Sequence, residues 1–408
     1  MIRTTNPFLV KLPEYSFLLF FAVLPFLDIF APIALAIVLL FGLLFSTKSS
    51  FFKHFAKNPG SLFLTVFFVL ALISLLYSTQ LDESQKKIGK LVVFFLIPIA
   101  FLLVNPSAKL LLRAQKIFIG SLILFCIISL ISLGYNYIAN YEISHWYNFV
   151  QTSMYHKYMP EDAMYLNTGL VLVLFGNFNK NVKVFVAFLF LTVIVLFGVR
   201  LGLLVFGLII SVYFLMNYKS FLTLRSLLIF LVGLALAFIF VQQSRYARDK
   251  LFDTLEKIGI TTGDQVSEIG EEYHNISLRE KMWSSSLYLV QKRPLIGYGA
   301  GTEKSELTSV YKERGYNMDK SFNAHSQYLS VMLQYGMFGL LWLGAVFLFF
   351  IYKSIQSKDI IALLITLVMA LSMVTESYLE LQQGIFYFCS FIMFLSFRLK
   401  LKKELLAI

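Results

Sequence analysis

Charged residues are scarce in this sequence. Only 14% of its 408 residues are Asp, Glu, Lys or Arg, whereas 58% are hydrophobic and 17% are aromatic. Soluble globular proteins have about 25% charged residues, which cover their surface. The composition therefore excludes a soluble globule and predicts an integral membrane protein.

The sequence also lacks the patterns of disulfide and metal sites. Its two cysteines, Cys126 and Cys389, lie inside apolar runs, which excludes a disulfide framework and a zinc-ligand spacing. His145 and His156 are not at a metal-ligand spacing, and Glu161-Asp162 is a weak alternative metal site. We therefore expect no metal ion and no cofactor.

Apolar runs, by contrast, are abundant. A bilayer span takes about 20 residues, with tolerance for shorter or tilted helices. Suitable runs lie at residues 16–27, 32–45, 62–77, 91–104, 117–137, 164–178, 184–199, 201–216, 227–241, 337–352, 360–374 and 385–399. The pattern predicts an all-α polytopic membrane protein with about twelve transmembrane helices.

The net charge of +12 is better explained by membrane topology than by nucleic-acid binding. Basic residues cluster in the short loops between apolar runs, and a cytoplasmic N-terminus places most of them on the cytoplasmic side. The basic residues of short loops that then face outward are Lys86, Lys87, Lys90, Lys157 and Arg200. We therefore expect a lipid bilayer as a partner and no nucleic acid.

One polar segment interrupts the apolar pattern and divides the chain into three parts. Residues 1–242 hold the first nine predicted spans, residues 243–323 form a large outward-facing loop with short helices, and residues 324–408 hold three spans and a basic cytoplasmic tail. The spans carry almost no ionisable residue at mid-depth, where ion-coupled transporters generally need one. The pattern favours chemistry at the outer face, with a transporter or a purely structural subunit as alternatives.

The large loop contains a candidate phosphate site at Arg279. Ser277-Leu278-Arg279-Glu280 fits a capping box, which predicts a helix that begins at Ser277 and stops before Pro294. Arg279 would project from the N-terminus of this helix, where free N–H groups and a guanidinium favour phosphate. The alternative is a surface ion pair with Glu280 or Glu272.

A glycine-rich segment follows this predicted helix. Its candidate substrate-binding residues are Arg293, Gly297, Tyr298, Gly299 and Gly301. Glycines let backbone N–H groups approach an anion closely, although a plain turn is the simpler interpretation. A second helix, capped by Thr302, is expected to end near Gly315.

A third motif carries the candidate proton acceptor, His325. Asn323 is predicted to cap a helix that begins with Ala324 and His325. A histidine in the first turn feels the positive end of the helix dipole, which disfavours imidazolium and leaves a ring that can accept a proton. Tyr328 would share its face and orient it or contact a substrate, and Gln327 lies beside it. The alternative is an interfacial histidine without a role.

Two further candidates lie at the outer ends of predicted spans. Arg200 occupies a tight outer turn, where a basic residue opposes the topological bias, so we expect a local purpose or a side chain that reaches lipid headgroups. Glu376 and Glu380, four apart, are predicted on one helix face as a base, a sugar contact or ion-pair partners of the arginines.

These segments together resemble the O-antigen ligase family. The resemblance rests on Arg200 between two spans, Arg279 in the long loop, Arg293-Pro294-Leu295-Ile296-Gly297-Tyr298-Gly299, and Asn323-Ala324-His325-Ser326-Gln327-Tyr328-Leu329 leading into a helix with Gly336 and Gly339. It is firmest over residues 279–339. The family also includes O-antigen and exopolysaccharide polymerases and protein O-oligosaccharyltransferases. Arg200 departs from the pattern, because Leu201-Gly202 follows it in place of small polar residues.

The resemblance implies an inverting, metal-independent glycosyltransferase of the bacterial inner membrane, active at the periplasmic face, with a fold similar to GT-C-type lipid-linked glycan transferases. Its donor would be a polyprenyl (undecaprenyl) diphosphate-linked glycan, with Arg200 and Arg279 on the diphosphate and His325 as the essential histidine. The acceptor would be a glycan, lipid A-core or protein hydroxyl. Ligase, polymerase and, less favoured, flippase remain alternatives.

Overall fold

The computed structural model describes residues 7–26, 29–45, 55–139, 159–221, 273–316 and 321–407. Within these ranges every regular element is a helix, which confirms the predicted all-α class. The predicted span at 227–241 and much of the predicted loop at 243–323 lie outside the described residues.

The helices follow the predicted apolar runs closely. Their bounds are α1 (Pro7–Val10), α2 (Leu12–Val23), α3 (Phe30–Phe45), α5 (Pro59–Ser74), α6 (Leu81–Leu91), α7 (Val93–Val104), α8 (Ala108–Ala139), α10 (Met159–Leu174), α11 (Lys180–Phe197), α12 (Arg200–Phe221), α15 (Tyr273–Lys292), α16 (Glu303–Glu313), α17 (Gln327–Gln356), α18 (Ile360–Ser372), the 3₁₀ turn η2 (Tyr378–Glu380), α19 (Gln382–Lys400) and α20 (Lys402–Ala407).

Several of these helices suit a membrane. Among the described residues, the stretches long and apolar enough to cross one are Leu81–Val104, Ala108–Ala139, Lys180–Phe197, Arg200–Asn217 and Gln327–Gln356. Shorter apolar helices accompany them, including α2, α3, α5 and α18. The chain is therefore a membrane protein, and the number of twelve spans stays a prediction.

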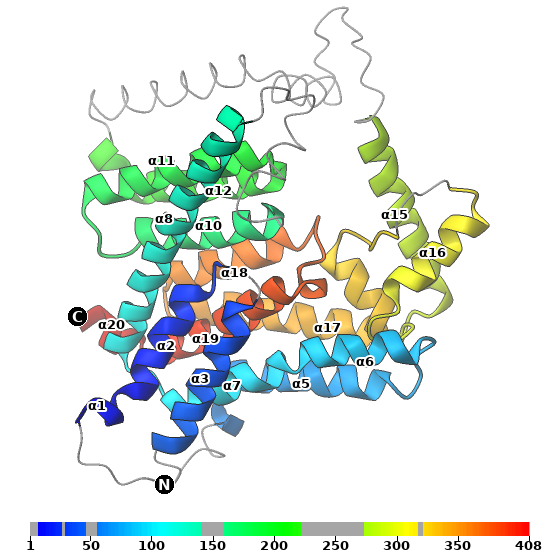
Figure 1. Ribbon diagram of the computed structural model, residues 1–408, viewed down its shortest axis with the longest axis horizontal. Helices are drawn as coiled ribbons and strands as arrows, with labels where there is room; N and C mark the ends of the chain where they lie inside the picture. The colour runs from blue at the N-terminus through cyan, green and yellow to red at the C-terminus, as the bar shows by residue number, and fades with distance from the viewer. Residues whose placement is uncertain are drawn as a thin grey trace, which may run out of the picture.

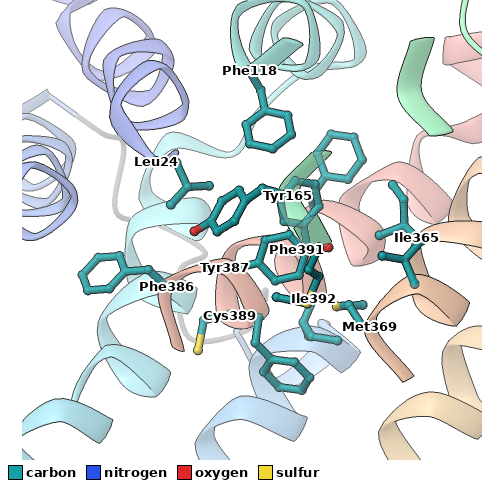
Figure 2. Packing of buried hydrophobic residues seen from close by; sticks show 14 of the residues in the cluster. Leu24, Phe118, Tyr165, Ile365, Met369, Phe386, Tyr387, Cys389, Phe391 and Ile392 are labelled. Carbon is teal, nitrogen blue, oxygen red and sulfur yellow. The ribbon is translucent and has the colours of Figure 1, made fainter. Parts of the chain in front are cut away.

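The centre of the bundle is α19. Its residues from Gln383 to Phe397 are all buried, on every side of the helix, as expected for a helix surrounded by others. Figure 2 shows the aromatic residues Phe386, Tyr387 and Phe391 of this helix among side chains from α8, α10 and α18 and from Leu24, which follows α2. The closest aromatic contacts include Tyr165 with Tyr387, at 4.7 Å between ring centroids.

The peripheral helices α11 and α12 have the opposite character. Large apolar side chains such as Phe185, Phe188 and Leu204 are exposed on them. Apolar surface of this extent is stable in a lipid environment, where no water has to be ordered around it. Gly202 brings α12 close to α10, because a Cβ atom there would lie 2.9 Å from the Cβ atom of Ala163. This close approach explains why the residue two positions after Arg200 is a glycine.

Helix α17 is broken at Gly336, which has φ 62° and ψ −152°. A Cβ atom at this position would lie 2.2 Å from the carbonyl oxygen of Leu295, so only glycine fits. The backbone groups released by the break bond to the glycine-rich segment: the N–H of Met337 donates to the carbonyl of Pro294, and that of Tyr298 donates to the carbonyl of Leu333. The break thus docks the segment 294–301 onto α17.

The polar elements gather at one end of the bundle. In Figure 1, α15 and α16 lie together beyond the ends of α6 and α17, on the right of the view, and the C-terminus lies on the left. The N–H of Thr79 donates to the carbonyl of Tyr298, and the N–H of Ala300 donates to the hydroxyl of Ser74. These bonds fix the glycine-rich segment to the connection between α5 and α6.

Three predicted helix boundaries were wrong. The predicted helix start at Ser277 lies inside α15, which begins at Tyr273, although its predicted end before Pro294 is confirmed. The helix expected from Ala324 begins at Gln327. The residues around Lys87, expected in an outer loop, form α6, a polar amphipathic helix that continues into α7.

Candidate functional site

The carboxylate of Glu376 joins the two best candidates of the sequence. Its Oε1 atom lies 3.1 Å from Nη2 of Arg279, and its Oε2 atom lies 2.9 Å from Nδ1 of His325. The three side chains come from α15, the segment before α17 and the segment after α18. Of the predicted roles for Glu376, an ion-pair partner of an arginine is confirmed.

This cluster is open to the outside of the helices. The side chain of Arg279 is 46% exposed, that of His325 31% and that of Glu376 18%. An ionised carboxylate only accepts hydrogen bonds, so Nδ1 of His325 must carry a proton toward Glu376. In the neutral ring, Nε2 is then an acceptor. Glu376 therefore fixes both the orientation and the tautomer of the imidazole.

The positions of Arg279 and His325 differ from the predictions. Arg279 lies inside α15 rather than at its start, so helix N–H groups do not surround it, and its ion pair is with Glu376 rather than Glu280. His325 precedes α17 and has φ 43°, in the left-handed region. Asn323 does not cap a helix at Ala324; its Oδ1 atom accepts the N–H of His325 at 3.2 Å.

Glu380 does not share a helix face with Glu376. Helix α18 ends at Ser372, and Glu380 lies in η2, where its Oε2 atom is 2.9 Å from Nζ of Lys87. The predicted shared face was wrong because the chain leaves the helix before either glutamate. The two carboxylates therefore belong to two different clusters.

The second cluster is buried and is built from α6, α16, α17 and η2. The side-chain amide of Gln334 donates to Oε2 of Glu303 at 3.1 Å and to Oε1 of Glu380 at 2.7 Å. Lys87 pairs with Glu380 and also donates to the carbonyl of Leu379 at 2.6 Å. Glu303 is only 2% exposed and Lys87 only 7%. Two carboxylates here share one buried lysine.

Because only one lysine serves the two carboxyl groups, their pKa values shift in opposite directions. Burial, with the neighbouring charge of Glu380, raises the pKa of Glu303 to about 7. Burial also disfavours the ionised form of Glu380, but the charge and hydrogen bond of Lys87 outweigh it, so the pKa of Glu380 is lowered. Lys87 therefore neutralises Glu380 first, and Glu303 is the group that holds a proton up to near neutral pH.

The glycine-rich segment is a docked turn rather than an anion cradle. Gly297, Gly299 and Gly301 have φ of 70°, 102° and 77°, which requires glycine. Their N–H groups donate to the carbonyls of Arg293 and Gln334 and to the side-chain oxygen of Gln334, respectively. Because these donors already have protein partners, the plain-turn interpretation holds. Thr302 directly precedes α16, but the predicted cap was wrong, because its hydroxyl donates to the carbonyl of Gly299 instead.

The other predicted binding residues have mainly structural contacts. Arg293 is exposed and its guanidinium lies over the Tyr298 ring, 4.9 Å from its centroid. The Tyr298 hydroxyl donates to the carbonyl of Leu289. Gln327 is buried and accepts the N–H of Leu379, and the Tyr328 hydroxyl donates to the carbonyl of Ala370. Tyr328 therefore holds α17 against α18 rather than orienting His325, and its predicted contact with a substrate stays a prediction.

Arg200 lies at the same end of the bundle as the cluster of Arg279, His325 and Glu376. It is the exposed first residue of α12, after a tight turn at Gly198 and Val199, as predicted. The carbonyl of Gly202 accepts the side chain of Asn167 on α10. The start of α10 is in turn held by Tyr378, whose hydroxyl donates to the carbonyl of Pro160. Tyr378 is two residues from Glu376.

Lys87 and Glu303 were not singled out in the sequence. A signal existed for Lys87, which is one of the few basic residues placed outside against the topological bias. Glu303 opens a predicted helix and looks like an ordinary first-turn acid. Within the described residues no group of three or more His, Cys, Asp or Glu is placed to hold a metal ion. At the alternative metal site Glu161-Asp162, the carboxylate of Asp162 accepts a hydrogen bond from the side-chain amide of Gln383.

Comparison with known proteins gives one similarity, to a family model over part of the chain. No curated protein matches the chain. Residues 185–343 match the family model described as O-antigen ligase, and this range contains Arg200, Arg279 and His325. Over these residues the chain is similar to O-antigen ligases, and its apolar helices are those of a membrane protein.

Proposed function

We propose that this protein is an O-antigen ligase-like glycosyltransferase that moves a glycan from a polyprenyl (undecaprenyl) diphosphate donor to an acceptor hydroxyl. The observation that carries the proposal is the Glu376 carboxylate between the Arg279 guanidinium and the His325 imidazole. Such an arrangement offers a cation for a leaving diphosphate beside a base for an incoming hydroxyl. Those are the two requirements of glycan transfer from a diphosphate carrier.

His325 acts as the general base in this proposal. Its Nε2 atom takes the proton of the acceptor hydroxyl, and Glu376 stabilises the imidazolium that forms. The acceptor oxygen bonds to the anomeric carbon while the bond from that carbon to the diphosphate breaks, and the diphosphate keeps the electron pair. A single displacement of this kind inverts the anomeric configuration.

The arginines supply positive charge to the leaving diphosphate. Arg279 has exposed guanidinium surface beyond its contact with Glu376, and its fork geometry suits phosphate oxygens. Arg200 heads a face of α12 on which Leu204 and Leu208, at helical spacing, are 70% and 40% exposed. We propose that a polyprenyl chain lies along this face with its diphosphate at Arg200. Positive charge from two arginines makes the reaction metal-independent in this proposal.

The site faces the periplasm of a bacterial inner membrane in the proposed orientation. The basic residues Arg398 and Lys402 lie at the end of the chain, on helices that run away from the cluster, and they match the cytoplasmic side of the positive-inside rule. Glycan transfer at the outer face then uses a donor already carried across the membrane by another protein.

Proteoliposomes test the proposal. Purified protein is mixed with a polyprenyl diphosphate-linked glycan and an acceptor, without any ion gradient. We expect glycosylated acceptor and polyprenyl diphosphate to appear in equal amounts. Movement of intact donor across the bilayer without covalent product contradicts the proposal and supports a flippase.

Surface glycans of a deletion strain then identify the acceptor. Loss of long chains from the lipid core supports a ligase, whereas retention of single repeat units supports a polymerase of the same family. Unchanged lipid-linked glycans with loss of protein glycosylation support a protein acceptor.

A further inference from the structure

We propose that Glu303 is a positioning residue for His325: its buried carboxylate fixes the backbone that carries the imidazole and sets the direction of a hydroxyl chain beside it. The catalytic part of this inference rests on the proposed function, whereas the positioning itself involves no substrate. Glu303 is 2% exposed, so it acts through other groups rather than by touching a glycan.

The backbone around His325 requires such support. A histidine with φ 43° is in a region that residues with a Cβ atom adopt rarely and at a cost in free energy. The structure holds it by bonding the N–H groups of the residues on both sides. That of Ala324 donates to Oε1 of Glu303 at 2.7 Å, and that of Ser326 donates to the hydroxyl of Ser377 at 3.2 Å.

The residues on either side of His325 are thus held by two different acceptors. The shorter bond is the one to Glu303, at 2.7 Å against 3.2 Å. Above about pH 7, where Glu303 is ionised, its bond to the N–H group is also stronger than one to a neutral acceptor. In a buried environment this difference increases, because the local dielectric constant is low. Glu303 is therefore the stronger of the two supports for the unusual conformation of His325.

A chain of hydroxyl groups connects Glu303 to the second support. The hydroxyl of Ser330 donates to Oε1 of Glu303 at 2.7 Å, and the oxygens of Ser330 and Ser377 are 2.7 Å apart. Each hydroxyl has one proton. Because Ser330 gives its proton to Glu303, Ser377 must donate to Ser330, which leaves lone pairs of Ser377 for the N–H of Ser326.

This order of donors reaches both partners of the exposed cluster. Ser377 directly follows Glu376, and Ser326 directly follows His325. The carboxylate of Glu303 therefore fixes two segments: the one that carries His325 and the one that carries Glu376, whose carboxylate orients the imidazole. The charged groups that face Glu303 are Glu380 and Lys87, bridged through Gln334. They keep the Glu303 side chain in a single orientation.

The test uses purified protein in lipid nanodiscs with ¹³C-labelled histidine rings. The chain has five histidines, and a His325→Gln variant identifies the signal of His325. We expect Glu303→Ala to shift and broaden this signal. In glycan transfer it lowers kcat by about tenfold to a hundredfold, with the KM for the donor unchanged, because misplacement of a reacting group affects the chemical step. Glu303→Gln keeps an acceptor oxygen and restores most of both readouts.

Two further variants sharpen the test. Glu313→Gln changes an exposed glutamate at the other end of α16 and serves as the matched control, with wild-type signal and kcat. Ser330→Ala interrupts the hydroxyl chain without removing a buried charge, so it decides the matter if Glu303→Ala does not fold. We expect it to move the His325 signal in the same direction.

The failure of this inference differs from the failure of the proposed function. A wild-type protein that transfers no glycan contradicts the proposed function, and the His325 signal still decides the positioning. An active wild-type protein whose His325 signal and kcat are unchanged in both Glu303→Ala and Ser330→Ala overturns the positioning role. A parallel loss of kcat and rise of KM without any shift of the signal overturns it as well.

Discussion

Glu376 and Glu380 are four residues apart, at the same end of the bundle, and have opposite surroundings. Glu376 is partly exposed and contacts an arginine and a histidine that are also partly exposed. The Glu380 side chain is about as exposed, at 15% against 18%, but its partners Lys87 and Gln334 are buried. The first arrangement leaves surface on its cation and its ring for a substrate. The second has its polar atoms engaged within the protein.

The comparison shows how one short segment serves two purposes. The residues between the two glutamates include Ser377, which bonds toward His325, and Leu379, whose carbonyl bonds to Lys87. The buried cluster therefore holds the segments that position the exposed cluster. We expect substitutions in the exposed cluster to lower the rate of glycan transfer, and substitutions in the buried cluster to lower stability first.

The largest expected effect is that of His325→Ala. Loss of a general base lowers the rate by about 10²- to 10⁴-fold. The measurement is glycan transfer by purified protein in proteoliposomes, with folding checked by thermal unfolding in detergent. The variant has the stability of the wild type, because the ring is partly exposed and contacts mainly Glu376. Normal transfer in a folded variant contradicts the role of His325.

A second comparison uses the same substitution at both glutamates. Glu376→Gln keeps the shape of the side chain but removes the charge that stabilises imidazolium, so we expect a loss of about a hundredfold in kcat. Glu380→Gln is the matched control and lowers the temperature of unfolding instead, because Lys87 loses its buried partner. Equal losses of kcat in the two folded variants would break the distinction between the clusters.

Lys87→Met sharpens the description of the buried cluster. It leaves Glu380 buried without its cation, which destabilises the protein by about 3 kcal/mol. The double variant Lys87→Met with Glu380→Gln removes both charges and recovers much of this loss, in a double-mutant cycle read from thermal unfolding. If the double variant is as unstable as the sum of the single variants, the two side chains are not coupled.

The smallest effect is a pH dependence of stability. The raised pKa of Glu303, about 7, means that the folded protein keeps a proton that the unfolded chain has released. Its contribution to stability is therefore full below about pH 4.5 and is lost as the pH rises through 7. We expect the temperature of unfolding to fall from pH 5 to pH 8 in the wild type and in Glu313→Gln, and to fall less in Glu303→Gln. Parallel curves for all three proteins contradict this origin.

The sequence predicted the scaffold and the exposed residues for different reasons. Apolar runs are long-range patterns of composition, and helices formed where they were expected, as at 337–352 and 385–399. Arg279, His325 and Glu376 stood out because charged residues are rare in this chain. An ion pair of Glu376 with an arginine was one of several alternatives, and its contact with His325 was not predicted, because residues from three separated segments meet through tertiary packing.

The missed features depend on local backbone geometry. His325 looked like the first turn of a helix, but the N–H groups around it bond to side chains of α16 and of the segment after α18, which keep it outside the helix. Glu376 and Glu380 were spaced for one helix face, yet α18 ends at Ser372. Glu303 follows the glycine-rich segment that the break at Gly336 docks onto α17, and Lys87 joins the cluster from α6 through Glu380.

The most direct test of the account is a structure of the protein with a polyprenyl diphosphate-linked glycan bound, determined by cryo-electron microscopy in nanodiscs. We expect the diphosphate to lie within hydrogen-bonding distance of the guanidinium groups of Arg200 and Arg279. We also expect Nε2 of His325 to face the anomeric carbon across the space for an acceptor hydroxyl. A diphosphate bound away from both arginines, or an imidazole turned from the sugar, contradicts the account.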